Sequence, residues 1–146
     1  MRTLALAATA AFAGGALLTQ TVIVPSWRAA PPEVFLARFA TEGPITGATV
    51  FPFELASLVL LALSIRGSSA RWWWAAATVC SAGTFVLLLY FVPANLALLD
   101  PAFPPRDVAG ALAAWNRWDW LRTGLGVAAT AFAVGAQLSV RAERRR

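Results

Sequence analysis

Three charged side chains lie inside otherwise apolar stretches of the sequence. Glu54 is surrounded by phenylalanine, proline, leucine and alanine, and Asp119 and Arg122 lie three residues apart in a later stretch. A carboxylate in such surroundings either pairs with a cation or stays protonated. On a helix Asp119 and Arg122 share a face, so the two acids would compete for one guanidinium. One acid could then act as a general base, which makes Glu54, Asp119 and Arg122 the candidate catalytic residues.

Amide and indole side chains are expected close to these charges. Gln20 lies near the end of the first apolar stretch and Asn95 after the third, at a depth similar to that of the charged residues, which predicts one shared pocket. Trp115 and Trp118 lie next to the charged pair and could form the walls of a site for a flat substrate, although tryptophans of a membrane interface need no ligand. These four are the candidate substrate-binding residues. Alternatively, the charged residues only lock helices together, with the two amides completing hydrogen bonds.

The composition excludes several kinds of site. The chain has no histidine, on which zinc, copper and haem sites and Ser-His-Asp triads usually depend. Its one cysteine, Cys80, lies within an apolar stretch and cannot form an internal disulfide or a CxxC motif. We therefore expect no metal site, and catalysis would use carboxylates, arginine, amides or a bound cofactor.

Four apolar segments are each long enough to cross a bilayer: about residues 3–24, 47–65, 72–92 and 118–140. With 59% hydrophobic residues and a mean hydropathy of +0.65, the chain is too apolar for a soluble domain of 146 residues. We expect a single domain over 1–146 that is all-α, an integral membrane four-helix bundle with the lipid bilayer as its partner.

The end of the first segment is marked by Pro25, where we expect the helix to stop. An alternative is that Arg2 and the alanine-rich stretch after it form a signal peptide, cleaved near Ala11-Phe12-Ala13. The length of the apolar run favours a helix that is retained.

The arginines predict the orientation. Arg2, Arg66, Arg71 and the basic tail 141–146 fall on one side of the predicted membrane, whereas the opposite loops carry acids that offset their arginines. The positive-inside rule then places both termini in the cytoplasm, with the chain in the inner (plasma) membrane. Because the arginines are spread between apolar segments and do not form one basic face, we expect no nucleic-acid binding.

Proline pairs mark both outer loops. Pro31-Pro32 and Pro104-Pro105 each precede a short amphipathic stretch, as is common at the start of a helix. We expect a short interfacial helix in each loop. Their likeness hints at a two-plus-two repeat, but coincidence explains it better.

Several short motifs follow one another in a recognisable order. They are Gln20 and Val24-Pro25-Ser26-Trp27, then Pro31-Pro32-Glu33-Val34-Phe35, Glu54, Tyr90-Phe91-Val92-Pro93-Ala94-Asn95, and Trp115-Asn116-Arg117-Trp118-Asp119-Trp120-Leu121-Arg122-Thr123. Over nearly the whole chain this order resembles the DUF1772 family, which includes anthrone oxygenase-like membrane proteins. The resemblance implies four membrane helices and an activity by which fungal relatives oxidise anthrones to anthraquinones with molecular oxygen, without a metal or flavin.

The resemblance also implies roles for single residues. Glu54, Asn95, Trp118 and Arg122 match family motif positions, whereas Asp119 stands where relatives often have histidine, which changes the available base. The function so implied is a cofactor-independent oxygenase in which a carboxylate removes a proton from a hydrophobic phenolic or polycyclic substrate. Arg122 and Asn95 would stabilise the resulting anion.

Two other functions are alternatives to this one. The first is a non-catalytic membrane module that binds a lipid or hydrophobic metabolite, or assists a larger membrane complex. The second is an ion pathway, which we do not expect because the inner halves of the segments carry only small polar groups such as Ser57 and Ser81.

Overall fold

The protein is an all-α four-helix bundle, as the sequence predicts. The computed structural model describes residues 1–143, so Arg144, Arg145 and Arg146 of the predicted basic tail lie outside the described residues. In chain order the elements are α1 (Arg2–Leu18), the π-helix η1 (Thr19–Ile23), α2 (Val24–Ala29), α3 (Pro32–Ile65), α4 (Arg71–Val86), α5 (Leu88–Leu99), the 3₁₀ helix η2 (Pro105–Asp107) and α6 (Val108–Glu143).

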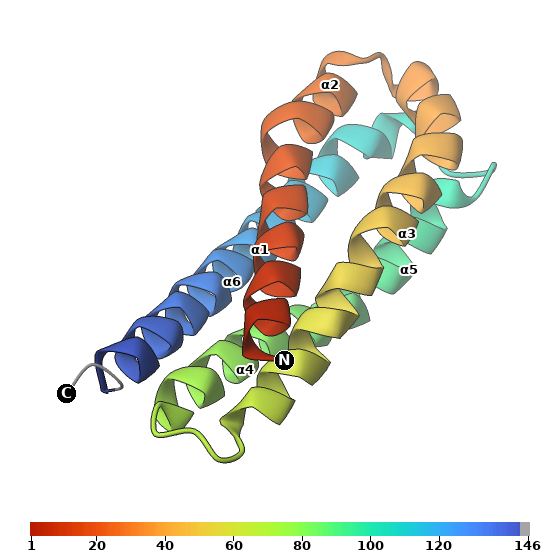
Figure 1. Ribbon diagram of the computed structural model, residues 1–146. Coiled ribbons are helices and arrows are strands. Elements are labelled where there is room, and N and C mark those ends of the chain that lie inside the picture. The colour runs from red at the N-terminus through yellow and green to blue at the C-terminus, as the bar shows by residue number, and fades with distance from the viewer. Residues whose placement is uncertain (144–146) are drawn as a thin grey trace.

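The helices form a ring in which α1 and α4 each pack against both α3 and α6 (Figure 1). Met1, the end of α6 and the turn at 66–70 lie together at one end of the bundle, called here the terminal end. The connections at 30–31 and 100–104 lie at the other, the loop end. Gly67 makes the tight turn possible, because its φ of 62° is costly for residues with a Cβ.

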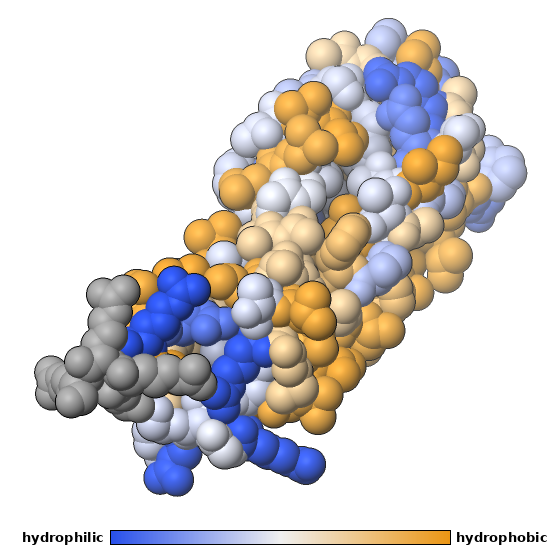
Figure 2. Space-filling model, in the orientation of Figure 1, coloured by the Kyte–Doolittle hydropathy of each residue, from blue (hydrophilic) through white to orange (hydrophobic). Residues whose placement is uncertain are grey.

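The bundle is apolar outside and partly polar inside. Within residues 1–143, four helices are long and apolar enough to cross a membrane: Arg2–Ala29, Pro32–Ile65, Arg71–Leu99 and Pro105–Ala142. Hydrophobic side chains cover much of the middle of the bundle, and hydrophilic ones gather toward its ends (Figure 2). By contrast, serines, threonines, Gln20, Glu54 and Asp119 are buried in the interior. This distribution suits a multi-pass protein whose solvent is lipid.

The first span does not end at Pro25, contrary to the sequence prediction. It continues through α2 to Ala29, because the helix widens just before the proline. In η1 the Val24 N–H bonds to the Thr19 carbonyl, five residues back, and Pro25 then occupies the first turn of α2, where its missing N–H costs little.

The two segments after the proline pairs are helical, but they are not separate interfacial helices. The first is the start of α3, which runs for 34 residues through Pro44 and Pro52. The second leads directly into α6, which starts at Val108 and not near residue 118. In α3 the buried rings of Phe35 and Phe39 pack on Trp27, and these contacts hold the segment against the bundle.

The third span also extends farther than predicted. A turn at Leu87 separates α4 from α5, and α5 continues past Pro93 to Leu99. Asn95 is therefore inside a helix and not beyond its end.

Candidate functional site

Glu54 and Arg122 form an ion pair between α3 and α6, as the sequence predicts. Arg122 Nη2 lies 2.6 Å from Glu54 Oε2, and Arg122 Nε donates a second hydrogen bond of 3.3 Å to Oε1. Glu54 is fully buried, whereas 16% of the Arg122 side chain is exposed. Two parallel hydrogen bonds from a guanidinium fix both position and orientation.

Asp119 and Gln20 extend this pair toward the first span. Asp119 Oδ1 lies 3.6 Å from Arg122 Nη1, and Gln20 Nε2 donates to Asp119 Oδ2 at 2.8 Å. Gln20 belongs to η1, so the π-helical turn places its amide against α6. Gln20, Glu54, Asp119 and Arg122 are called here the charged cluster. It holds two carboxylates against one guanidinium, and Asp119 Oδ1 has no hydrogen-bond partner among residues 1–143.

Two phenylalanine rings enclose the guanidinium. The Arg122 Cζ atom lies 5.1 Å from the centre of the Phe12 ring and 5.6 Å from that of Phe91, within the range of cation–π attraction. Gly126, one turn after Arg122, leaves room for Phe12, since a Cβ there would be 2.8 Å from Phe12 Cε1. Sequence reasoning missed these three residues, and the only signal was the spacing of Gly126 from Arg122 on one helix face.

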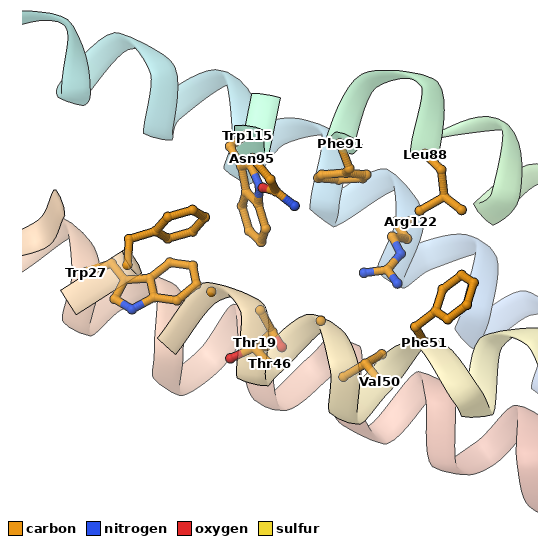
Figure 3. Close-up of a pocket in the computed structure, with 13 residues that line it drawn as sticks. Thr19, Trp27, Thr46, Val50, Phe51, Leu88, Phe91, Asn95, Trp115 and Arg122 are labelled. Carbon is orange, nitrogen blue, oxygen red and sulfur yellow. The ribbon is translucent and has the colours of Figure 1, made fainter. Parts of the chain in front are cut away.

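Arg122 faces a cavity of about 110 Å³ in the loop half of the bundle (Figure 3). The cavity lies between α3 and α5, with contributions from η1, α2 and α6. Among its lining residues Arg122 is the one with a charge, and aromatic rings form much of the wall. The lining residues are Thr19, Trp27, Phe39, Gly43, Thr46, Gly47, Val50, Phe51, Leu88, Phe91, Asn95, Trp115 and Arg122.

Asn95 adds a second polar group to the cavity wall. Trp115 Nε1 donates to Asn95 Oδ1 at 2.9 Å, and both residues line the cavity. This bond occupies the amide oxygen and directs the amide nitrogen, a double donor, toward the open space (Figure 3). Trp27, on the opposite wall, is held by its Nε1, which donates to Glu42 Oε2 at 2.7 Å.

The structure divides the predicted site residues into two groups. Asn95, Trp115 and Arg122 line the cavity, whereas Gln20, Glu54 and Asp119 lie on the other side of Arg122. Trp118 packs against Tyr90, with ring centres 5.4 Å apart and planes tilted by 36°. Helix geometry explains the division. At about 100° per residue, Trp115 and Arg122 share one line along α6, with Trp118 and Asp119 on opposite sides of it. Trp118 therefore turns to α5 and Asp119 to η1.

A second polar group lies in the terminal half, called here the hydroxyl cluster: Thr9, Ser57 and Ser81. Thr9 Oγ1 and Ser57 Oγ are 2.9 Å apart, and Ser57 Oγ and Ser81 Oγ are 3.3 Å apart. None of the three lines the cavity. They join α1, α3 and α4 through neutral hydrogen bonds.

No family model, curated protein or solved structure matches the chain. The resemblance to DUF1772 therefore stays a prediction from the sequence. Within the described part of the chain, no group of three or more histidine, cysteine or acidic side chains is placed to hold a metal ion. The donors that line the cavity include the Arg122 guanidinium, the Asn95 amide and the Thr46 hydroxyl, which suit an oxygen atom of an organic ligand.

Proposed function

We propose that the chain is a membrane-embedded oxidoreductase of the DUF1772, anthrone oxygenase-like type. It would bind a hydrophobic phenolic or polycyclic compound and promote its oxidation by molecular oxygen. One observation carries the proposal: a partly buried guanidinium, paired with carboxylates on the side away from the cavity, faces a cavity with aromatic walls.

The cavity suits an aromatic ring that bears an oxygen. Arg122 and Asn95 can donate hydrogen bonds to that oxygen, while Trp27, Phe91 and Trp115 pack against the ring. The donors are fixed before a ligand arrives, by Glu54 for Arg122 and by Trp115 for Asn95. Preorganised donors in an apolar site stabilise a phenolate or enolate more than they stabilise its neutral parent.

The charged cluster provides a place for the proton that the substrate loses. Its two carboxylates share one guanidinium, and Asp119 has an oxygen without a hydrogen bond among the described residues, whereas Glu54 accepts two bonds from Arg122. We assign Asp119 as the base. Because Asp119 lies behind Arg122 and does not line the cavity, one water molecule would have to carry the proton from the substrate to its carboxylate. For a methylene between aromatic rings, the carbanion adds O₂, protonation gives a hydroperoxide, and loss of water leaves a ketone. The sum is R₂CH₂ + O₂ → R₂CO + H₂O.

The test is oxygen uptake by the purified protein with an anthrone as substrate. We expect Asp119→Asn to lower kcat by at least about 100-fold, the smallest effect usual for the loss of an acid–base group. Glu54→Gln should also lower kcat, because Arg122 loses the carboxylate that fixes its guanidinium. Asp107→Asn, which changes an exposed acid outside the site, is the matched control and should keep full activity. Equal product yield from the wild type and from the folded site variants would refute the proposal.

The second candidate is a non-catalytic module that binds a lipid or hydrophobic metabolite or assists a larger complex. It is favoured by one observation, that neither carboxylate lines the cavity. This candidate predicts saturable binding of an aromatic compound without oxygen uptake, and site variants that lose stability or affinity only.

We also propose that the terminal end faces the cytoplasm and that the chain resides in the plasma membrane. Arg2, Arg66, Arg71 and Arg141 support this, because all four lie at that end. A reporter protein fused after residue 146 should be active in the cytoplasm and inactive outside. The reverse result would invert the topology.

A further inference from the structure

The cavity reaches the apolar surface of the bundle between α3 and α5. Two of its lining residues on α3, Gly47 and Phe51, are exposed, with 42% of Phe51 accessible. Leu88 lines the cavity from the α5 side. These residues belong to spans whose exposed surfaces are apolar, so this opening faces lipid rather than water.

Gly47 keeps the opening clear. A Cβ at this position would meet no atom within 4 Å, although the residue lines the cavity. The adjacent turn is different, because a Cβ at Gly43 would lie 3.0 Å from the Phe39 ring. The free space at Gly47 thus joins the cavity to the lipid-facing surface.

The size of the cavity limits what can enter completely. Its volume is about 110 Å³. This is smaller than an engineered protein cavity of about 150 Å³ that accepts benzene, so the enclosed space holds at most about one ring. A fused tricyclic compound would not fit inside it, whereas one ring could enter and leave the rest of its molecule in the opening.

We infer that the cavity takes the single oxygen-bearing ring of a membrane-resident lipid, a phenol or quinol with an alkyl or isoprenoid tail. The ring passes sideways between α3 and α5 at Gly47 and places its oxygen at Arg122 and Asn95, while the tail stays in the bilayer. This inference rests on the proposed function, because it uses the same two donors and narrows the substrate class.

The test measures binding of 4-decylphenol to the protein in lipid nanodiscs by calorimetry, with empty nanodiscs subtracted. Gly47→Leu fills the opening and should weaken binding at least about tenfold, the effect of one misplaced methylene or more in an apolar pocket. Gly14→Leu is the matched control. It adds the same side chain to an exposed helical glycine that also has no atom within 4 Å of a Cβ, but Gly14 does not line the cavity.

Wild-type affinity in Gly47→Leu, or an equal loss in both variants, would overturn the claim that the ring enters the cavity at Gly47. Phenol that binds as tightly as 4-decylphenol at equal total concentration would overturn the role of the tail, and no binding by the wild type would overturn the whole inference. Tail-dependent binding without oxygen uptake would uphold the inference and refute the oxidase. Oxidation of anthrone without binding of 4-decylphenol would uphold the oxidase and refute the inference about a lipid-like phenol.

Discussion

The charged cluster and the hydroxyl cluster bury polar groups in the same bundle with different results. Glu54 and Ser57 are one turn apart on the same face of α3, and both are fully buried. Ser57 meets other hydroxyls, and the Thr9 hydroxyl donates to the Ala5 carbonyl of its own helix. Glu54 meets a guanidinium that also faces a cavity.

This difference distinguishes polar groups that only join helices from polar groups that could bind a ligand. Neutral hydroxyls in lipid are satisfied by one another and by helix carbonyls, and they need no space beside them. A buried carboxylate needs a cation, and here the cation keeps one side open to a cavity. Polarity inside the membrane therefore marks a functional site when it combines charge with space.

The largest effect is expected from Arg122→Ala, which leaves Glu54 buried without its cation. Breaking a buried ion pair in this way costs about 3–5 kcal/mol of unfolding free energy. Denaturant titration in mixed micelles measures the loss. A cost of less than about 1 kcal/mol would show that Glu54 is not held by this pair.

A neutral variant separates charge from packing. Glu54→Leu, Asp119→Asn and Arg122→Met together remove all three charges, and replacing buried ion pairs with apolar groups is often neutral or stabilising. We expect this variant to unfold at wild-type denaturant concentrations or above. Unfolding as easy as that of Arg122→Ala would mean that the cluster is required for folding itself.

A smaller effect is expected from Gly126→Ala, which pushes Phe12 away from Arg122. Overpacking of this kind costs about 1–3 kcal/mol, again read from denaturant titration. Gly124→Ala is the control, because a Cβ there meets nothing within 4 Å and should be neutral or slightly stabilising. Equal effects of the two changes would disprove the tight contact with Phe12.

Trp115→Phe should act on the cavity more than on the fold. It keeps a ring but removes the donor to Asn95, and the loss of one neutral hydrogen bond is worth about 0.5–1.5 kcal/mol. Affinity for 4-decylphenol should fall by a few fold. Trp120→Phe, at a half-exposed position outside the cavity, should leave affinity unchanged. Loss of affinity in both would point to a general effect of tryptophan on the bundle.

The smallest effect is expected in the hydroxyl cluster. Ser57→Ala removes hydrogen bonds to Thr9 and Ser81, and hydrogen bonds between membrane helices are worth about 0.6 kcal/mol on average. Unfolding free energy should fall by about that amount, with binding and oxygen uptake unchanged. A loss of turnover in folded Ser57→Ala would join this cluster to the site.

The spans were predictable because lipid imposes a minimum length and an apolar surface on each helix. The residues at which the helices begin and end were not predictable. Pro25 reads as a stop unless a π-turn precedes it, and the start of α3 is held to the bundle by contacts with Trp27 that no local pattern reveals.

The ion pair was predictable for a similar reason, since Glu54 needs a cation and Arg122 is the nearest one at its depth. The cavity was not predictable from the sequence, because it depends on which side of α6 each residue faces and on contacts between distant segments. Trp118 and Asp119 turned away from it on opposite sides, and Phe12 approaches Arg122 only because Gly126 lacks a side chain.

In the proposed function, Arg122 presents its charge to the oxygen of a ring in the cavity. The most direct measurement compares the affinity of 4-decylphenol for the wild type and for the folded neutral variant in the same nanodiscs. Hydrogen bonds to charged groups contribute about 1.5–3 kcal/mol, so the account predicts a loss of about 10- to 150-fold. Equal affinities in the two proteins would contradict it.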